Sequence, residues 1–335
     1  MHIPDGVLDP KVAAATAVIA AGGLAYGLRR LRDRLGDRTT VLMGSMAAFV
    51  FAAQMVNFPL YPFPVSGHLL GGVLAAVLLG PWAGAAVIGA VLIVQCFLFG
   101  DGGLTALGAN FVNMGLIGSV GGYTIHAPIR RGIGGRRGIL LGSMAAAWFS
   151  VILASGAFAV ELAASGRGVA FLDVLGWMAL VHAAIGLGEA LITGMVVRFL
   201  LLTRPDLVDD AGPPDGSRAA RWGRVALAGL GVAVAVAIFL APWASEHPDG
   251  LEFVGGQKVK FLPPDGSGPA PAFAAPIPDY ELPGLAKLNP AAATAAAGVV
   301  GTLVVFGVGL VLARAVGRGE AGASSWREGV PADAA

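Results

Sequence analysis

Nine apolar segments separated by short polar loops constrain the fold of this chain more than any other feature. They cover residues 11–28, 41–56, 69–80, 82–99, 105–125, 138–163, 171–200, 224–243 and 291–316. A helix needs about 20 apolar residues to cross a bilayer, and most of these segments approach or exceed that length. Only 13% of the 335 residues are charged, against about 25% in a soluble domain. We therefore predict an all-α polytopic membrane protein with about nine transmembrane helices.

The third and fourth segments run together, so they form either one long helix or two helices broken at Gly80-Pro81. With two helices and the N-terminus outside, four segments lie inside, and they hold 17 of the 22 Lys and Arg residues: RRLRDRLGDR, IRRGIGGRRG, residues 198–224 and the C-terminal tail. Cytoplasmic loops carry such an excess of basic residues. A single span over 69–99 would remove most of this bias. We predict two spans, the first of them short, with the N-terminus outside and the C-terminus inside.

The chain begins with MHIPDGVLDP, which differs from a secretory signal. Its first basic residue is Lys11, and the apolar run that follows ends in RRLRDRLGDR. A signal peptide has basic residues before its apolar run and a cleavage site after it, so we expect this start to be retained. The predicted topology places it on the outer face, together with the loop NFPLYPFPVSG that leads to His68.

His2 and His68 together favour a metal site. A free amino group, the amide nitrogen of residue 2 and the imidazole of His2 can close two fused chelate rings on one metal ion. A second imidazole, such as that of His68, completes a square-planar set of four nitrogens. This geometry suits Ni(II) or Cu(II), and low-spin Co(II) adopts it too, whereas Zn(II) prefers a tetrahedron. Taken alone, each histidine is more often a terminal, capping or surface group. Their shared side of the membrane favours the metal role only modestly.

Four ordered stretches resemble a known family. MHIPDGVL, NFPLYPFPVSGHLLGGVLAAVLLGPWAG, QCFLFGDGGLTALGANFVNMG and HAAIGLGEALITG closely resemble successive stretches of the substrate-binding M subunit of cobalt and nickel energy-coupling-factor transporters. Residues 248–252, PDGLE, resemble the small two-span N subunit of the same transporters. We therefore expect a fused chain with a metal-binding domain over 1–205, a cytoplasmic linker over 206–223, an N-type domain over 224–316 with an outer loop at 244–290, and a cytoplasmic tail over 317–335.

The resemblance implies that the terminal amine of Met1, the amide and imidazole of His2, and the imidazole of His68 hold the metal. It implies a substrate-capture subunit that imports Ni2+ or Co2+ across a prokaryotic plasma membrane, cobalt being needed for cobalamin biosynthesis. The fusion inclines the assignment slightly toward nickel. The partners it implies are a transmembrane coupling subunit and cytoplasmic ATPase subunits. The sequence has no GxxxxGK[ST] phosphate loop, so we expect no ATP hydrolysis by this chain.

Several polar residues within the apolar segments have more than one interpretation. Asn57, Gln95, Asn110 and Asn113 either orient the metal-binding groups or act as hydrogen-bonding links between helices. His182 and Glu189 share a helix face, and we favour an internal structural lock for them. They also admit the alternative of an intramembrane zinc-dependent hydrolase, although HAAIGLGE lacks the HExxH spacing. A channel or structural subunit without metal is a third class. We expect no resident cofactor, no nucleic-acid partner, and membrane lipid around the spans.

The outer loop and its carboxylates leave weaker expectations. Residues 244–290 are rich in Pro and Gly, and we expect much of this loop to be poorly ordered unless it packs on the first region, the predicted metal-binding domain over 1–205. Asp249 and Glu252 of PDGLE offer transient cation contacts, but Pro-Asp-Gly is also ordinary turn chemistry. Asp101, in the outer loop GDGGL, either attracts cations or caps the helix that follows it, and we favour the cap.

Overall fold

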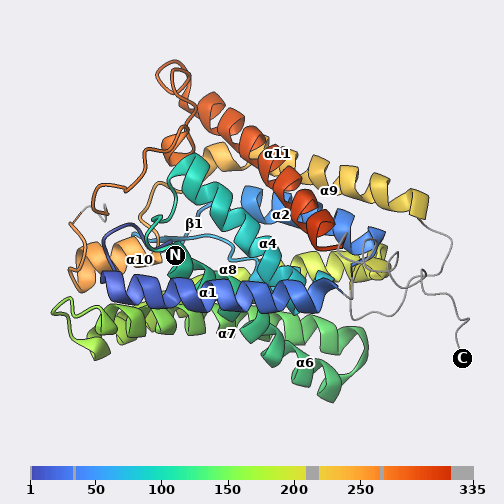
Figure 1. Cartoon of the computed structure of the whole chain (residues 1–335), viewed down its shortest axis with the longest axis horizontal. Coiled ribbons are helices and arrows are strands. Elements are labelled where there is room, and N and C mark those ends of the chain that lie inside the picture. Colours follow the sequence, from blue (N-terminus) through green and yellow to red (C-terminus); the bar gives the residue numbers. More distant parts are fainter. Residues whose placement is uncertain (1, 33–34, 209–218, 265–267, 318–335) are drawn as a thin grey trace, which may run out of the picture.

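The computed structural model describes residues 2–32, 35–208, 219–264 and 268–317 (Figure 1). These residues are mostly helical, as predicted, and their strands are one short antiparallel pair, β1 (Phe58–Pro59) and β2 (Ser66–Gly67). Part of the predicted linker and nearly all of the predicted tail lie outside the described residues. The domain boundaries at 205 and 224 stay predictions.

The first region contains eight α-helices, which the π-helices η1 and η2 extend or join. Residues 107–133 are continuously helical, as are residues 81–99. The elements in chain order are α1 (Pro10–Arg32), α2 (Asp37–Gln54), α3 (Gly72–Leu79), α4 (Pro81–Val94), η1 (Gln95–Phe99), α5 (Leu107–Asn110), η2 (Phe111–Gly121), α6 (Gly122–Ile133), α7 (Gly135–Ala164), α8 (Phe171–Thr203) and the 3-10 turn η3 (Pro205–Leu207).

The second region adds two long helices joined by a loop that carries short helical turns. Its elements are α9 (Ala219–Phe239), η5 (Ala241–Trp243), α10 (Gly250–Phe253), η6 (Val254–Lys258), η7 (Pro278–Tyr280) and α11 (Pro290–Gly317). Both α9 and α11 pack on α2 of the first region (Figure 1). A Cβ added at Gly301 of α11 would lie 2.2 Å from the Phe51 ring of α2, so only glycine permits this approach. The two regions therefore share one packed core.

The predicted break at Gly80-Pro81 is confirmed. Helix α3 ends at Leu79 and α4 begins at Pro81, with Gly80 between them at φ 91°. Glycine adopts this left-handed conformation without steric cost, and proline is well suited to the first position of a helix. Helices α3 and α4 pack against each other, so the chain reverses direction here.

The prediction of about nine transmembrane helices, the third of them short, is not confirmed. Within the described residues, six helices are both long and apolar enough to cross a membrane: Pro10–Arg32, Pro81–Phe99, Gly135–Ala164, Phe171–Thr203, Trp222–Trp243 and Pro290–Gly317. The eight residues of α3 extend only about 12 Å, less than half of the roughly 30 Å hydrocarbon core. Residues 65–80 are nevertheless buried throughout, including the irregular backbone before α3. Non-helical backbone at membrane depth is tolerated where protein encloses it.

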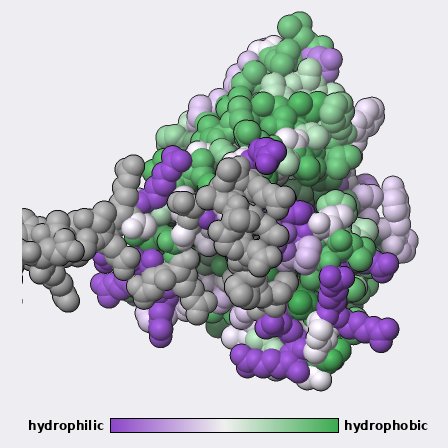
Figure 2. Space-filling view, turned by 90° about the vertical axis from the view of Figure 1, so that its right-hand side faces the viewer, coloured by the Kyte–Doolittle hydropathy of each residue, from purple (hydrophilic) through white to green (hydrophobic). Residues whose placement is uncertain are grey.

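The ends of the molecule differ in charge. Arg29, Arg30 and Arg32 lie in the last turn of α1, and Arg130 and Arg131 lie in the last turn of α6. In Figure 1 both helices end on the right, away from the N-terminal residues, β1 and α10 on the left. Figure 2 looks onto the right-hand end, where many hydrophilic side chains gather beneath a largely hydrophobic upper part. This separation agrees with the predicted clustering of basic residues on one side, while the orientation of that side toward the cytoplasm stays a prediction.

Candidate metal-binding site

The N-terminal segment lies in a fixed position because side chains from distant elements bind its backbone. The Ile3 amide donates to Asn110 Oδ1 at 2.8 Å, and Asn110 Nδ2 donates back to the Ile3 carbonyl at 3.1 Å. Asp5 accepts from the amide and hydroxyl of Thr105 through Oδ1, and from the Ala272 amide through Oδ2. Burial opposes ionisation of Asp5, but these hydrogen bonds prevail and lower its pKa. The start of the chain is therefore held against both regions.

The imidazoles of His2 and His68 lie side by side, as the sequence predicts. Their ring centroids are 5.3 Å apart with planes 16° from parallel. His2 Nε2 lies 3.2 Å from Gln95 Oε1, and His2 Nδ1 lies 3.1 Å from Asp101 Oδ1. Burial lowers the pKa of His2, although the Asp101 carboxylate acts in the opposite direction. Burial thus favours the neutral ring, the form in which imidazole binds metals.

A chain of side-chain amides orients Gln95 toward His2. The Leu70 carbonyl can only accept, and it accepts from Gln54 Nε2 at 2.9 Å. Gln54 Oε1 then accepts from Gln95 Nε2 at 2.8 Å, which turns Gln95 Oε1 toward His2 Nε2. This oxygen favours a proton on Nε2, while the Asp101 carboxylate 3.1 Å from Nδ1 is an acceptor too. Both ring nitrogens of His2 therefore face acceptor oxygens, and Nδ1 is the nitrogen that can close a six-membered chelate ring with the amide of the same residue.

The backbone around His68 is anchored by the opposite helix. His68 Nδ1 lies 3.0 Å from the Leu69 carbonyl, which can only accept. Next along the chain, the amides of Leu70 and Gly71 donate to the two carboxylate oxygens of Glu189 on α8. The predicted structural lock is present at Glu189, where it holds the irregular segment that leads into α3. His182 is described separately below.

The PDGLE segment of the second region lies against this site. Asp249 caps α10 by accepting from the amides of Leu251 at 2.7 Å and Glu252 at 2.9 Å, while Glu252 accepts from the Asp249 amide at 2.8 Å. This reciprocal arrangement is a capping box. Ser66, two residues before His68, donates through its amide to the Pro248 carbonyl and through its hydroxyl to the His247 carbonyl, both at 2.8 Å. The turn predicted at Pro-Asp-Gly is therefore docked beside His68.

Both regions line an open cavity of about 770 Å3 at this site. Its acidic lining residues are Asp5, Asp101, Asp249 and Glu252. Burial opposes ionisation of Asp249, but neighbouring His68 and the Glu252 amide help to lower its pKa. Burial, with the charge of Asp249, raises the pKa of Glu252 to about 7. A cavity with several carboxylates raises the local concentration of cations.

The four side-chain amides predicted to orient the metal-binding groups make different contacts. Gln95 contacts His2, and Asn110 holds Ile3. Asn57 lines the open cavity, and its carbonyl accepts from the Ser245 amide. Asn113 instead donates to Glu161 at 2.9 Å, so its hydrogen bond is a link between helices.

Gln54 and Tyr280 at the site were not singled out by the sequence, and Asp101 was expected to have another role. Gln54 completes the amide chain. Asp101, for which a helix cap was favoured, instead faces His2 and accepts from the Tyr280 hydroxyl at 2.6 Å. Gln54 and Tyr280 carry no motif of their own, and only the fold brings them to the site.

Met1, the source of the predicted terminal amine, lies outside the described residues. Within those residues no three His, Cys, Asp or Glu side chains come close enough to hold one metal ion. A site made of two imidazoles and two backbone nitrogens needs no such group. Glu189 binds backbone amides through both oxygens, and nothing in the described part favours the alternative zinc hydrolase.

Comparison with known proteins gives consistent matches over both regions. Residues 2–207 match the family described as cobalt uptake substrate-specific transmembrane region, and residues 223–318 match the PDGLE domain. A protein of Archaeoglobus fulgidus that bears the name NikMN, for fused nickel transport, is 37% identical over 94% of this chain and 98% of its own length. The fused nickel transport protein NikMN of Rhodobacter capsulatus is 31% identical over 92% of this chain and 96% of its own. A crystal structure of a truncated transition metal transporter, 30% identical, covers 60% of this chain and 99% of that one with a TM-score of 0.54.

Proposed function

This chain belongs to the cobalt uptake substrate-specific transmembrane family and carries a PDGLE domain after that region, and we propose that it is the metal-capture subunit of an energy-coupling-factor importer for Ni2+ or Co2+. The family is one of nickel and cobalt transport proteins, and the protein is a multi-pass membrane protein. The observation that carries the proposal is the stacked pair His2 and His68, with Gln95 and Asp101 in contact with the His2 ring.

Capture uses two backbone and two side-chain nitrogens. His2 Nδ1, together with the amide of His2 and the terminal amine of Met1, closes two fused chelate rings on the metal. His68 supplies the fourth donor. Two imidazoles and two backbone nitrogens in one plane favour Ni2+ and low-spin Co2+ over Mg2+ and Ca2+, which need oxygen ligands. Binding displaces the amide proton, so affinity falls as the pH falls.

The PDGLE region has an accessory role in loading the metal. Its carboxylates Asp249 and Glu252 line the open cavity that leads to His2 and His68, and they attract cations to it. Relatives in which both regions are fused bear the names of nickel transport proteins, which supports nickel over cobalt as the main substrate.

The energy for transport comes from other subunits. We assign it to cytoplasmic ATPases that act through a transmembrane coupling subunit, because this sequence has no phosphate-binding loop. This chain breaks no covalent bond. It receives the metal on the outer face of a prokaryotic plasma membrane and releases it inward when the complex rearranges.

The decisive test blocks the terminal amine. The protein, purified with a C-terminal tag only, is compared with a version that has three extra residues before Met1. Three are used because a single extra residue would create a new amine, amide, amide and imidazole chelate. The native terminus is expected to bind about one Ni2+ or Co2+ with a square-planar absorption spectrum.

The extended version is expected to lose both the metal and the spectrum. The matched control carries the same three residues at the C-terminus and is expected to bind normally. Equal binding by all three proteins would overturn the N-terminal chelate, as would full binding by both His2→Ala and His68→Ala.

A further inference from the structure

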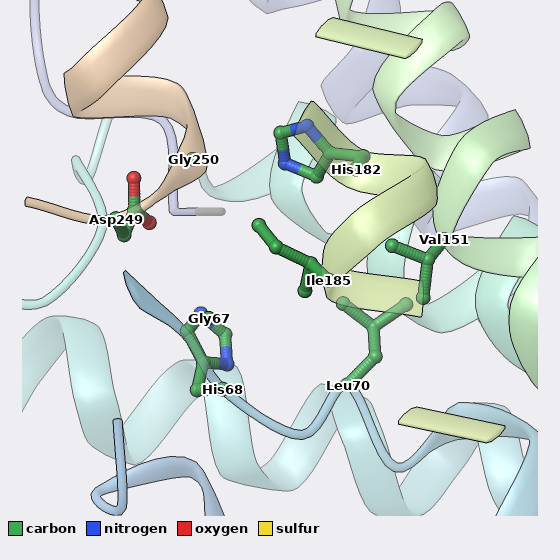
Figure 3. Close-up of a pocket in the computed structure, with 8 residues that line it drawn as sticks. All are labelled: Gly67, His68, Leu70, Val151, His182, Ile185, Asp249 and Gly250. Carbon is green, nitrogen blue, oxygen red and sulfur yellow. The ribbon is translucent and has the colours of Figure 1, made fainter. Parts of the chain in front are cut away.

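A small cavity lies behind the site, between α8, α10 and the segment that carries His68. Its volume is about 10 Å3, and it is lined by Gly67, His68, Leu70, Val151, His182, Ile185, Asp249 and Gly250. Figure 3 shows the His182 ring pointing from α8 toward the space beside Asp249, with His68 on the facing segment and Ile185 reaching in between. This volume suits one water molecule or one ion.

His182 presents an unshared lone pair to this cavity. Its Nδ1 lies 2.9 Å from the Met178 carbonyl, which can only accept, so Nδ1 carries the proton. The other nitrogen, Nε2, is then the acceptor, and among the described residues it has no hydrogen-bond partner although His182 is only 1% exposed. Metal-binding histidines commonly have this arrangement, with one nitrogen donating to a backbone carbonyl and the other facing the metal.

The surroundings of Nε2 are kept open by the PDGLE segment. A Cβ added at Gly250 would lie 3.0 Å from His182 Nε2 and 2.9 Å from its Cε1, so a larger residue would crowd the nitrogen. Asp249, the neighbour of Gly250, brings a carboxylate to the same cavity, and His68 brings the imidazole that the capture site also uses. A neutral imidazole with a carboxylate at hand suits a divalent transition metal ion.

We propose that His182 is a transit ligand, which receives the transported Ni2+ or Co2+ from the N-terminal chelate and holds it while it moves inward. The proposal rests on the proposed function. His68 is common to both positions, so the ion exchanges its N-terminal donors for His182 while it stays bound to His68. The described residues place no three His, Cys, Asp or Glu side chains around one point, which fits a passing position and not a resting one.

Cobalt titration of a cysteine variant tests whether metal reaches His182. The protein carries His182→Cys together with Cys96→Ala, so that the introduced thiol is its only one. Because the two positions share His68, Co2+ is expected to give a thiolate-to-cobalt charge-transfer band at the expense of the square-planar spectrum of the capture site. The matched control is Thr193→Cys with Cys96→Ala, because Thr193 is also buried on α8 and its hydroxyl has no hydrogen-bond partner in the described part of the chain. It is expected to give no band.

Nickel uptake by cells that depend on this chain provides the second test. His182→Leu is expected to bind metal at the capture site with an unchanged spectrum but to lower the uptake rate by about tenfold or more. His182→Cys, which keeps a ligand atom, is expected to restore part of the rate, whereas a merely structural role would leave both variants equally slow.

Two results would overturn the transit ligand. One is wild-type uptake by His182→Leu. The other is a His182→Cys protein that fills its capture site yet shows no thiolate band, or one no stronger than that of Thr193→Cys. These outcomes are separate from a failure of the proposed function, which appears as unchanged metal binding after N-terminal extension.

Discussion

The two regions of the molecule hold their parts of the metal site in different ways. In the first region, side chains from distant helices bind the backbone: Asn110 holds Ile3 across 107 residues, and Glu189 holds Leu70 across 119. In the second region, the PDGLE segment is held by its own residues, since Asp249 and Glu252 cap α10 from within four positions. The first arrangement needs the whole helical bundle, whereas the second needs only a turn.

This difference assigns separate tasks to the two regions. A backbone anchored by buried side chains has few alternative positions, which suits a chelate whose nitrogens must lie in one plane. A self-capped turn keeps its own local shape, and Ser66 joins it to the site. Loss of a long-range anchor should therefore damage the fold and the metal site, whereas loss of the local cap should alter only the docking of the loop.

The largest effect is expected for Glu189→Ala. It leaves the amides of Leu70 and Gly71 buried without an acceptor, and each costs about 1–3 kcal/mol. The midpoint temperature of thermal unfolding of the detergent-purified protein should fall clearly below that of the wild type. Metal binding should be lost because the segment that carries His68 is no longer held in place. Glu161→Ala is the matched control, because Glu161 accepts from a side chain, Asn113, and not from backbone. An equal loss of stability in both variants would contradict the special role of backbone anchoring.

Asn110→Leu should have the next largest effect. It removes both hydrogen bonds to Ile3 and so releases the segment that carries His2. The loss of a group that orients a metal ligand typically lowers the metal affinity by about 10–100-fold. Competition with a chelator of known affinity measures the change. Asn113→Leu, one turn further along and bonded to Glu161, should leave the affinity within about threefold of wild type, and a similar loss in both would remove the distinction.

Asp249→Ala should loosen the PDGLE turn of the second region without destabilising the helical bundle. Loss of a helix cap costs about 1 kcal/mol, and here it loosens α10 at its contact with the His68 segment. Hydrogen exchange over residues 244–264 should speed up about fivefold, while the stability of the helical bundle stays unchanged. Asp249→Ser keeps a capping oxygen and should retain most of the protection. Global destabilisation by Asp249→Ala would show that the loop is not an independent unit.

The pH dependence of loop docking should be smaller still. Burial raises the pKa of Glu252 to about 7 from an ordinary value of 4.5. The docked state therefore binds a proton more readily than the free loop, and docking strengthens as the pH falls through 7 and loses this contribution above it. Between pH 8 and 7 the gain is about twofold. Hydrogen exchange corrected for intrinsic rates measures it, and Glu252→Gln, which can still cap, should abolish the dependence.

Much of the site follows from the sequence, but not all of it. The topology placed His2 and His68 on one side of the membrane, and the structure stacks their rings. Gln95 and Asn110 reach the N-terminal segment as one interpretation allowed, but Asn113 does not, because an amide in an apolar helix binds whichever polar group the neighbouring helix presents. Asp101 faces His2 and Tyr280 because the outer loop folds back onto it, which no local pattern near residue 101 encodes.

Four features follow from the amino-acid sequence alone: the membrane class, the break at Gly80-Pro81, the gathering of basic residues at one end of the molecule, and the family of nickel and cobalt transport proteins. Each of these depends on local composition or on residues next to one another. Three further features required the folded structure. The third apolar segment is a short helix that follows buried irregular backbone, and Glu189 anchors this backbone. His182 faces the PDGLE segment. These contacts join residues about 70 to 120 positions apart, and a buried polar group takes the partner that packing supplies, which periodicity along one helix does not specify.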